Sequence, residues 1–514
     1  MRNVYVKLAL SFLLTCFVGY TQAQSREFEN VVSVELKSTV TIKNNNTIVG
    51  YAFFYKLEKM KKAALYRLEI LDENLKSIGS NEFEGSKELI LEGALYESGN
   101  ILLAFSDPRK TDDYEKFVKV FDLKGKEKGL VSYDPEKVKK GMFGAAVAEQ
   151  MSNYYNGYSN VEGKGFVCVY QSKAKVGGAD VQFIDLNGKM KWEKNISADK
   201  GDRMDLYLTS TTPNAVIFFC SERGGIMDRD TKNFIIGLDP TTGKELYKKS
   251  MDVNEYAWEP MFFKIDEKNE FKMISTLTKE EDKFYTAKPI GFNVVTLNDK
   301  TGDFKVDKNF TYENDLSKVL DMKNESKSEE GYIKVHDICI MPDGSKVVIG
   351  EFFRRTVSAM GAAMKVLSRT HSAAAAQISI GDAFILRTDK NNNPTSLEKI
   401  EKSVDRVPLP ADGMPLGLVQ RWLGLEGWFG YMYTDEGLGG SKKSFLVRGE
   451  FEGERYGTNA VTFDEKKGYK VKKFTIEKEK KERVYLQRGK PGHVLVTKYN
   501  SKQKTLKVNL ERID

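Results

Sequence analysis

The sequence predicts an all-β fold, a β-propeller of eight four-stranded blades, from two observations. A strand–turn–strand unit recurs along the chain, and its turns at Asp72, Asp122, Asp185, Asp239 and Asp299 are 50 to 63 residues apart. Four short strands with their turns occupy about that length. One four-stranded sheet cannot bury both of its faces, whereas sheets stacked around an axis can, so the recurrence favours a closed ring.

Other arrangements are compatible with the same pattern. Seven blades is one alternative, and a β-sandwich array or two separate β domains is another. With 514 residues, the chain is too long for one ordinary hydrophobic core unless the fold is a repeat.

The clearest copy of the repeat lies at residues 233–248. Phe234–Leu238 is apolar enough for a strand that is buried on both faces, and residues 244–249 alternate as a more solvated outer strand should. Between them, Asp239-Pro240-Thr241-Thr242-Gly243 has the residues of a tight turn. Further copies turn at Asp72, Asp122, Asp185, Asn298, Asp389 and Asp464, and a degenerate copy turns at Asn500.

The end of the chain provides only part of a blade. Three strands are predicted near Val484–Leu486, His493–Thr497 and Thr505–Leu510, without a fourth. We predict that Phe28–Leu36 supplies the missing strand, because this pairing would close the ring and leave no open sheet edge.

The segment at 239–248 resembles the outer hairpin of quinoprotein-like (PQQ-repeat) propellers. In that family a Trp usually follows the Gly-Lys-x-x run, but Tyr247 stands there in this chain, and Trp192 in the preceding copy is the closer match. The resemblance therefore implies a propeller and no quinone, and we expect no cofactor. The whole chain also resembles uncharacterised secreted β-propeller-like proteins of Gram-negative bacteria, which offer no activity to transfer.

The N-terminus is typical of a secretory signal peptide. Arg2 and Lys7 precede the apolar run Leu8–Tyr20, and Thr21-Gln22-Ala23 provides small residues for cleavage after Ala23. We expect a signal peptide at 1–23, a single propeller domain at 24–514, and export to the periplasm or the extracellular space. Cys16 allows a lipoprotein alternative, but the preceding Thr15 argues against lipid anchoring. No later run approaches 18 apolar residues, so no transmembrane segment is predicted.

The charge pattern argues against a nucleic-acid-binding protein, and the cysteines argue against a disulfide-bonded one. Removal of the signal lowers the net charge from +7 to +5, and residues of both signs alternate, as in Glu477–Glu482, which is not the basic groove of a nucleic-acid-binding protein. Cys168, Cys220 and Cys339 lie in apolar, strand-like runs. Their odd number and long spacing argue against disulfides, so we expect buried, unreactive side chains.

Two stretches interrupt the repeat, near 136–152 and 356–376, and a short helix is predicted in each. Phe143, Val147 and Met151 recur at helical spacing in the first stretch, and Val357, Met360, Met364 and Leu367 do so in the second. These insertions could pack on the propeller, form an adaptable lip that binds a partner, or insert into a membrane surface. The candidate binding residues here are Met142, Phe143, Arg354, Arg355, Met360 and Met364.

The densest aromatic stretch runs from Trp422 to Tyr433. Packing between blades would explain it. If it is exposed, its side chains, among them Trp422, Trp428 and Tyr431, would form a stacking platform for a sugar or a peptide.

Catalytic and metal-binding motifs are missing from the sequence. It contains no Gly-x-Ser-x-Gly, His-Glu-x-x-His or Walker motif, and its three histidines (His336, His371 and His493) are far apart. The turn that begins at Asp389 resembles a calcium loop but has Pro394 and Ile400 where Gly and Glu are required. We expect no metal, and the sequence identifies no catalytic residue.

Two functional hypotheses follow. The favoured one is an exported, monomeric, non-enzymatic propeller whose loop-face insertions hold a protein, peptide or glycan partner. The alternative is a propeller enzyme of the glycoside hydrolase or lyase type, with carboxylates contributed by several blades.

Overall fold

The computed structural model of the protein describes most of the chain after the predicted signal peptide. The described residues are 24–513 except 36–38, 45–46, 111–112, 134–156, 172–177, 199–202, 225–231, 254–255, 267–269, 280–287, 325–326, 358–375, 410–418, 421–422, 424–426, 436–441, 453–454 and 465–467. The predicted signal peptide lies outside this part of the chain, as do the interiors of both predicted helical insertions.

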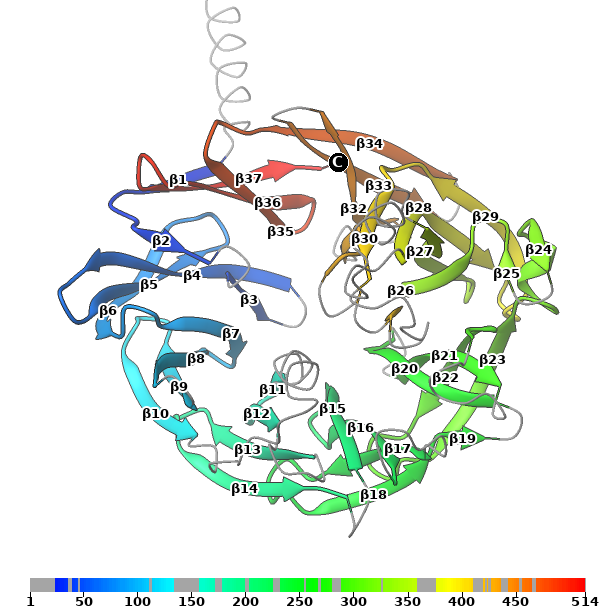
Figure 1. Ribbon diagram of the computed structural model, residues 1–514, viewed down its shortest axis with the longest axis horizontal. Coiled ribbons are helices and arrows are strands. Elements are labelled where there is room, and N and C mark those ends of the chain that lie inside the picture. Colours follow the sequence, from blue (N-terminus) through cyan, green and yellow to red (C-terminus); the bar gives the residue numbers. More distant parts are fainter. Residues whose placement is uncertain are drawn as a thin grey trace, which may run out of the picture.

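The described strands form eight antiparallel blades arranged in a ring (Figure 1). This confirms the eight-bladed propeller and excludes the seven-bladed ring and the β-sandwich array. Successive blades follow one another along the chain, and each contributes four main strands from the inside of the ring to its rim. The innermost strands of successive blades therefore run in the same direction through the ring.

The first four blades occupy residues 33–250. Blade 1 contains β2 (Ser33–Val34), β3 (Val40–Asn44), β4 (Thr47–Lys59), β5 (Ala64–Asp72) and β6 (Ser77–Gly85). Blade 2 contains β7 (Ile90–Glu97), β8 (Asn100–Lys110), β9 (Asp113–Asp122) and β10 (Glu127–Tyr133). Blade 3 contains β11 (Gly157–Val161), β12 (Gly165–Gln171), β13 (Ala179–Asp185) and β14 (Met190–Ile196). Blade 4 contains β15 (Arg203–Thr211), β16 (Val216–Arg223), β17 (Lys232–Leu238) and β18 (Glu245–Ser250).

The last four blades carry short additions. Blade 5 contains β19 (Asp252–Val253), β20 (Tyr256–Ile265), β21 (Phe271–Lys279), β22 (Gly291–Leu297) and β23 (Phe304–Thr311). A 3-10 helix, η2 (Leu316–Lys318), and a hairpin of β24 (Met322–Asn324) and β25 (Lys327–Ser328) follow. Blade 6 contains β26 (Tyr332–Ile340), β27 (Lys346–Val357), β28 (Ala376–Thr388), β29 (Pro394–Ile400) and β30 (Asp405–Pro408). Blade 7 contains β31 (Tyr431–Asp435), β32 (Lys442–Glu452), β33 (Arg455–Asp464) and β34 (Gly468–Glu477). Blade 8 contains β35 (Glu482–Arg488), β36 (His493–Asn500), β37 (Thr505–Arg512) and β1 (Gln24–Phe28).

The repeated turns depend on one type of hydrogen bond. The Asp239 carboxylate accepts the backbone N–H groups of Thr241 and Thr242, and this side chain thereby fixes the turn between β17 and β18. Equivalent bonds are made by Asp72, Asp122, Asp185, Asn298 and Asp389. Asn500 makes the same turn, but between the second and third strands of blade 8 rather than before an outer strand.

An N-terminal strand closes the ring, as predicted, but its predicted bounds were wrong. β1 pairs with β37 from Gln24 opposite Leu510 to Phe28 opposite Leu506. The predicted segment, Phe28–Leu36, overlaps it at one residue only. Beyond Phe28 the chain leaves blade 8, and Ser33 and Val34 pair with β4 of blade 1.

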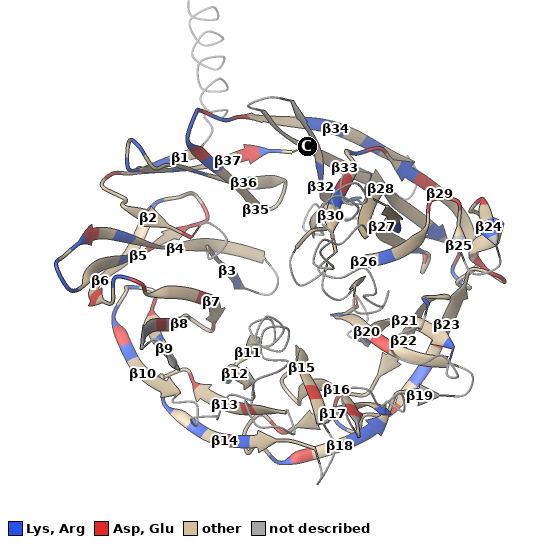
Figure 2. Ribbon diagram, viewed as in Figure 1, with Lys and Arg blue, Asp and Glu red and all other residues tan. Residues whose placement is uncertain are grey.

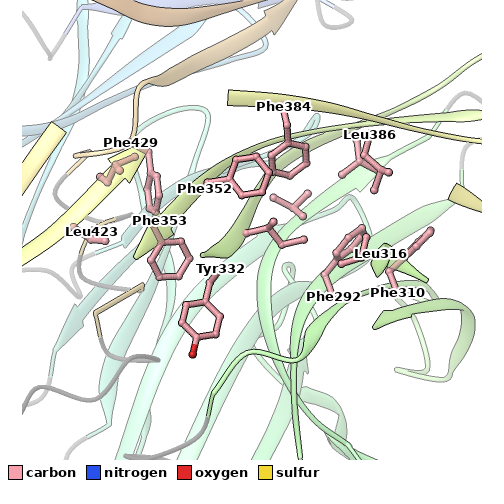
Figure 3. Packing of buried hydrophobic residues seen from close by; sticks show 14 of the residues in the cluster. Phe292, Phe310, Leu316, Tyr332, Phe352, Phe353, Phe384, Leu386, Leu423 and Phe429 are labelled. Atoms are coloured by element: carbon pink, nitrogen blue, oxygen red, sulfur yellow. The ribbon is translucent and has the colours of Figure 1, made fainter. Parts of the chain in front are cut away.

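Apolar side chains fill the spaces between neighbouring blades. The largest cluster joins blades 5 and 6 to the segment before blade 7, and it includes Phe292, Phe310, Phe352, Phe384 and Phe429 (Figure 3). Cys168, Cys220 and Cys339 are free thiols that are fully buried in such clusters, as predicted. Burial also raises the pKa of the Cys168 thiol to about 12, which makes this side chain a poor nucleophile.

The outer rim of the propeller carries charged residues of both signs, as the sequence predicted (Figure 2). Lys and Arg alternate with Asp and Glu around the rim (Figure 2).

Thr356 and Val357 end β27, and Ala376 begins β28, so these three residues of the second predicted insertion belong to strands. Among the described residues, no helix is long and apolar enough to cross a membrane.

Closure of the ring predicts that Phe28→Ala is strongly destabilising. Phe28 is 7% exposed and packs against Phe53 and Tyr55 of blade 1. Loss of the phenyl group of Phe28 should cost about 3 kcal/mol of the free energy of unfolding, measured by denaturant titration. Ser25→Ala on the exposed face of β1 is the control and should cost less than about 0.5 kcal/mol. Equal effects of the two substitutions would contradict this role of Phe28.

Candidate central binding site

A cavity of about 1020 Å³ lies inside the ring and is lined by residues of blades 1, 4, 5, 6, 7 and 8. Most of these residues belong to innermost strands: Thr41 of β3, Tyr207 to Thr209 of β15, Glu259 to Phe263 of β20, Lys334 to His336 of β26, Tyr431 to Tyr433 of β31 and Tyr485 to Arg488 of β35. Gln420, Gly427 and Phe429, from the segment before β31, complete one side.

A recurring irregularity places side chains in this cavity. In five blades the innermost strand has one extra residue opposite the second strand, a β-bulge, at Glu92, Thr209, Met261, His336 or Met432. A bulge redirects its side chain and increases the local twist. Four of these five residues, all except Glu92, line the cavity.

Aromatic rings dominate the wall of the cavity. The aromatic lining residues are Tyr207, Phe219, Phe262, Phe263, Phe429, Tyr431, Tyr433 and Tyr485. The ring of Tyr431 is stacked in parallel on His336, with the centroids 4.9 Å apart and an interplanar angle of 3°. Phe429 meets the edge of the same imidazole at 5.0 Å. Two residues of the aromatic stretch, Phe429 and Tyr431, therefore contribute both to packing and to the wall of the cavity.

A buried carboxylate holds this wall in place. Glu351 of β27 is fully buried, and its Oε1 lies 3.0 Å from the ammonium of Lys402, which is also fully buried. The two carboxylate oxygens accept the backbone N–H groups of Gly430 (3.0 Å) and Tyr431 (2.9 Å). Nε2 of His336 lies 2.9 Å from Oε2. Glu351 thus ties the start of the innermost strand of blade 7 to blade 6.

Burial and neighbouring groups determine the protonation states of Glu351 and His336. Burial by itself would raise the pKa of Glu351, but contacts with His336, Lys402 and the Tyr431 amide outweigh it and lower this pKa to about 2. Burial lowers the pKa of His336, and the nearby Glu351 only partly offsets this effect. At neutral pH, Lys402 is therefore the cation that compensates Glu351, and His336 presents a neutral ring.

Cationic side chains gather on the side of blades 6 to 8. Lys334, Arg448 and Arg488 line the cavity. Arg448 lies 3.6 Å from Asp405, and Arg488 lies 3.4 Å from the buried carboxylate of Asp435. Among the described lining residues, Glu259 of blade 5 is the single carboxylate.

The residues predicted from the sequence fall in different places. Of these, Tyr431 lines the cavity. Trp428 is 39% exposed, and Arg354 and Arg355 are exposed on β27, away from the described lining. The other candidates, Met142, Phe143, Met360, Met364 and Trp422, lie outside the described residues.

Several prominent site residues had no signal in the sequence. His336, Glu351, Lys402, Gln487 and Arg488 are single residues in ordinary strands or turns, and no spacing links them. Within the described part of the chain, no group of three or more His, Cys, Asp or Glu side chains is arranged to hold a metal ion.

The fold and the site define a class: an eight-bladed propeller with an aromatic cavity in its centre. The chain belongs to a family of proteins of unknown function, DUF6770, whose family model matches residues 1–514. No curated protein matches the chain.

Solved structures with similar folds are distant. Prolyl oligopeptidase B from Galerina marginata, bound to a 25mer macrocyclization substrate, is 9% identical with a TM-score of 0.38; the match covers 93% of this chain but only 56% of that one. The β-propeller domain of the Trilobed protease from Pyrococcus furiosus is 11% identical with a TM-score of 0.34, covering 83% and 98%. The quinohemoprotein alcohol dehydrogenase ADHIIG from Pseudomonas putida HK5 is 10% identical with a TM-score of 0.28, covering 89% and 66%. We transfer no activity from any of them.

The buried cluster predicts a large, pH-dependent effect of Glu351→Ala. This substitution removes the nearer of the two carboxylates beside the buried Lys402 ammonium, Glu351 at 3.0 Å and Asp405 at 3.8 Å, and should cost about 3–5 kcal/mol of the free energy of unfolding at pH 7. The folded-state pKa of Glu351 lies below its ordinary value of 4.5, so this contribution is complete above pH 4.5 and is lost as pH falls toward about 2. Denaturant titrations of both proteins between pH 7 and pH 3 measure the difference.

A second variant controls for simple loss of packing. Glu351→Leu combined with Lys402→Met removes both charges and should recover much of the lost stability. A double variant as unstable as Glu351→Ala, or a cost that does not change with pH, would contradict the electrostatic account.

Proposed function

We propose that this protein is an exported, non-enzymatic binding protein that holds an organic ligand, the end of a glycan or a peptide, in its central cavity. The observation that carries the proposal is the cavity itself, about 1020 Å³ in volume and lined by eight Phe and Tyr rings among its described residues. Cavities of several hundred to about 1,000 Å³ with mainly apolar and aromatic walls are typical of small-molecule sites. Aromatic faces stack on sugar rings and on apolar side chains.

The type of polar residue in the wall supports binding rather than hydrolysis. Paired-carboxylate glycosidases need two carboxyl groups about 5–10 Å apart across the scissile bond. Glu259 is the one carboxylate among the described lining residues, and the nearby Glu351 is engaged by Lys402 and two backbone N–H groups. A proton donor and a nucleophile are therefore not paired in this wall.

The topology also supports a role for the two insertions as a lip. Residues 134–156 precede the start of the innermost strand β11, and residues 358–375 join the end of β27 to the start of β28. Because the innermost strands run in the same direction, the strand ends that flank both segments lie on one face of the ring. A ligand that enters from this face would pass the strand ends that flank both segments. Export itself rests on the predicted signal at residues 1–23.

A cavity-filling substitution tests the proposal. The full-length protein, expressed with its leader and purified natively, should carry an organic molecule that mass spectrometry of its extract identifies. Thr41→Trp, which fills the cavity next to blade 8, should abolish retention of that molecule. Thr475→Trp on the exposed outer strand β34 is the matched control and should retain it.

Two results would count against the proposal. One is a wild-type extract that contains no molecule missing from the Thr41→Trp extract. The other is equal loss of the molecule from both variants, provided that circular dichroism shows both to be folded.

A further inference from the structure

One part of the cavity wall, at the end of β35 in blade 8, has two buried hydrogen-bond donors without acceptors. Nε2 of Gln487 and Nε of Arg488 are buried, and neither has a hydrogen-bond partner among the described residues. Both residues line the cavity. Buried donors in folded proteins are nearly always paired, so two adjacent exceptions at a cavity wall indicate a place for an acceptor that the chain does not supply.

The carboxylate near Arg488 leaves one edge of the guanidinium available. Oδ1 of Asp435 accepts from Nη2 of Arg488 at 3.4 Å, and Oδ2 accepts the backbone N–H of Gly492 at 2.9 Å. Asp435 therefore holds the far end of the guanidinium in position, and Nε remains free. A guanidinium edge is suited to oxygen atoms of carboxylates and phosphates.

Further basic side chains lie beside this corner or in the same cavity wall, and Arg488 and Arg448 are each near a carboxylate. Lys43 lies on the same face of β3 as the cavity-lining Thr41, and it keeps contact with solvent. Burial lowers its pKa most, and the charge of Arg488 lowers it further. Arg448 of blade 7 also lines the cavity, 3.6 Å from Asp405. The cavity carboxylate Glu259 belongs to blade 5 and is not part of this corner.

We infer that this corner, formed by Gln487 and Arg488 with Lys43 beside them, binds an oxyanion of the ligand, a carboxylate or a phosphate. The inference depends on the proposed function, because it assigns a chemical class to the molecule held in the cavity. Tyr485 and Tyr433 line the same cavity and would stack on the ring or side chain that carries the anion.

A second orphan group indicates what else the ligand carries. Gln420 is 5% exposed, and its Nε2 donates to Thr276 at 3.0 Å, while its Oε1 has no partner among the described residues. Gln420 also lines the cavity. An acceptor of this kind fits a hydroxyl or amide N–H, so the ligand class is an oxyanion with a separate hydrogen-bond donor, as found in uronic acids and in peptide C-termini.

Matched pairs of probes test the oxyanion directly. Binding to the full-length protein is measured by ligand-observed NMR and calorimetry for D-glucuronic acid against D-glucose, and for N-acetyl-L-tyrosine against N-acetyl-L-tyrosine amide, with inorganic phosphate as a fifth probe. At least one oxyanion should bind at least about tenfold more tightly than its uncharged counterpart, or, for phosphate, detectably by itself. The pair that shows the preference distinguishes a sugar source from a peptide source.

Three variants test whether the preference for the oxyanion depends on Gln487 and Arg488. Gln487→Leu removes one orphan donor without disturbing Asp435, and Arg488→Gln removes the charge, so both should abolish the preference for the oxyanion. Arg26→Gln removes the same charge from the exposed outer strand β1 and should leave the preference unchanged. Gln487→Leu should also remain as stable as wild type, because it removes a buried donor that has no partner.

The possible failures are distinct. If the uncharged probes bind as tightly as the acids, or if the preference survives both Gln487→Leu and Arg488→Gln, the oxyanion site is wrong while the proposed function stands. If no probe binds and the native extract is empty, both are wrong. Phosphate binding that persists in both variants identifies an adventitious ion only and overturns the inference.

Discussion

Closure of the ring is the constraint on which the rest of the structure depends. A four-stranded blade has two apolar faces and can bury them only against two neighbours. The first and last blades become neighbours because β1 pairs with β37, and because Phe28 and other apolar residues of blades 1 and 8 pack together. This contact joins residues that are almost the whole chain apart. Once it forms, the facing apolar surfaces of blades 8 and 1 cover each other, and the innermost strands enclose a cavity.

Regular strands alone would give a ring with a uniform wall. The bulges at Thr209, Met261, His336 and Met432 each add one residue to an innermost strand and direct its side chain toward the centre. Glu351 then fixes the start of β31 from the adjacent blade. Architecture and site thus have separate origins: the hairpin repeat builds the ring, and local departures from the repeat line its centre.

The difference between these origins explains which features the sequence predicted. Asp239 and its counterparts act on backbone groups two to four residues away, so their pattern is local, and the propeller with its number of blades followed from it. Glu351 and Lys402 lie about 50 residues apart within blade 6, and Arg488 and Asp435 lie about 50 residues apart on blades 8 and 7. No local pattern marks such pairs. A bulge depends on how two strands pair, which residue types do not determine. The sequence correctly predicted that an N-terminal strand closes the ring, but it gave the wrong bounds. Of the predicted segment, Phe28–Leu36, only Phe28 lies in β1.

The central claim is that the cavity inside the ring is a ligand site. A crystal structure of the natively purified protein tests it most directly. The account predicts continuous electron density in the cavity, stacked on the tyrosine rings of its wall, with an oxygen-bearing group within hydrogen-bond distance of Nε of Arg488. A cavity that contains only separate water molecules, with Arg488 hydrated, would contradict it.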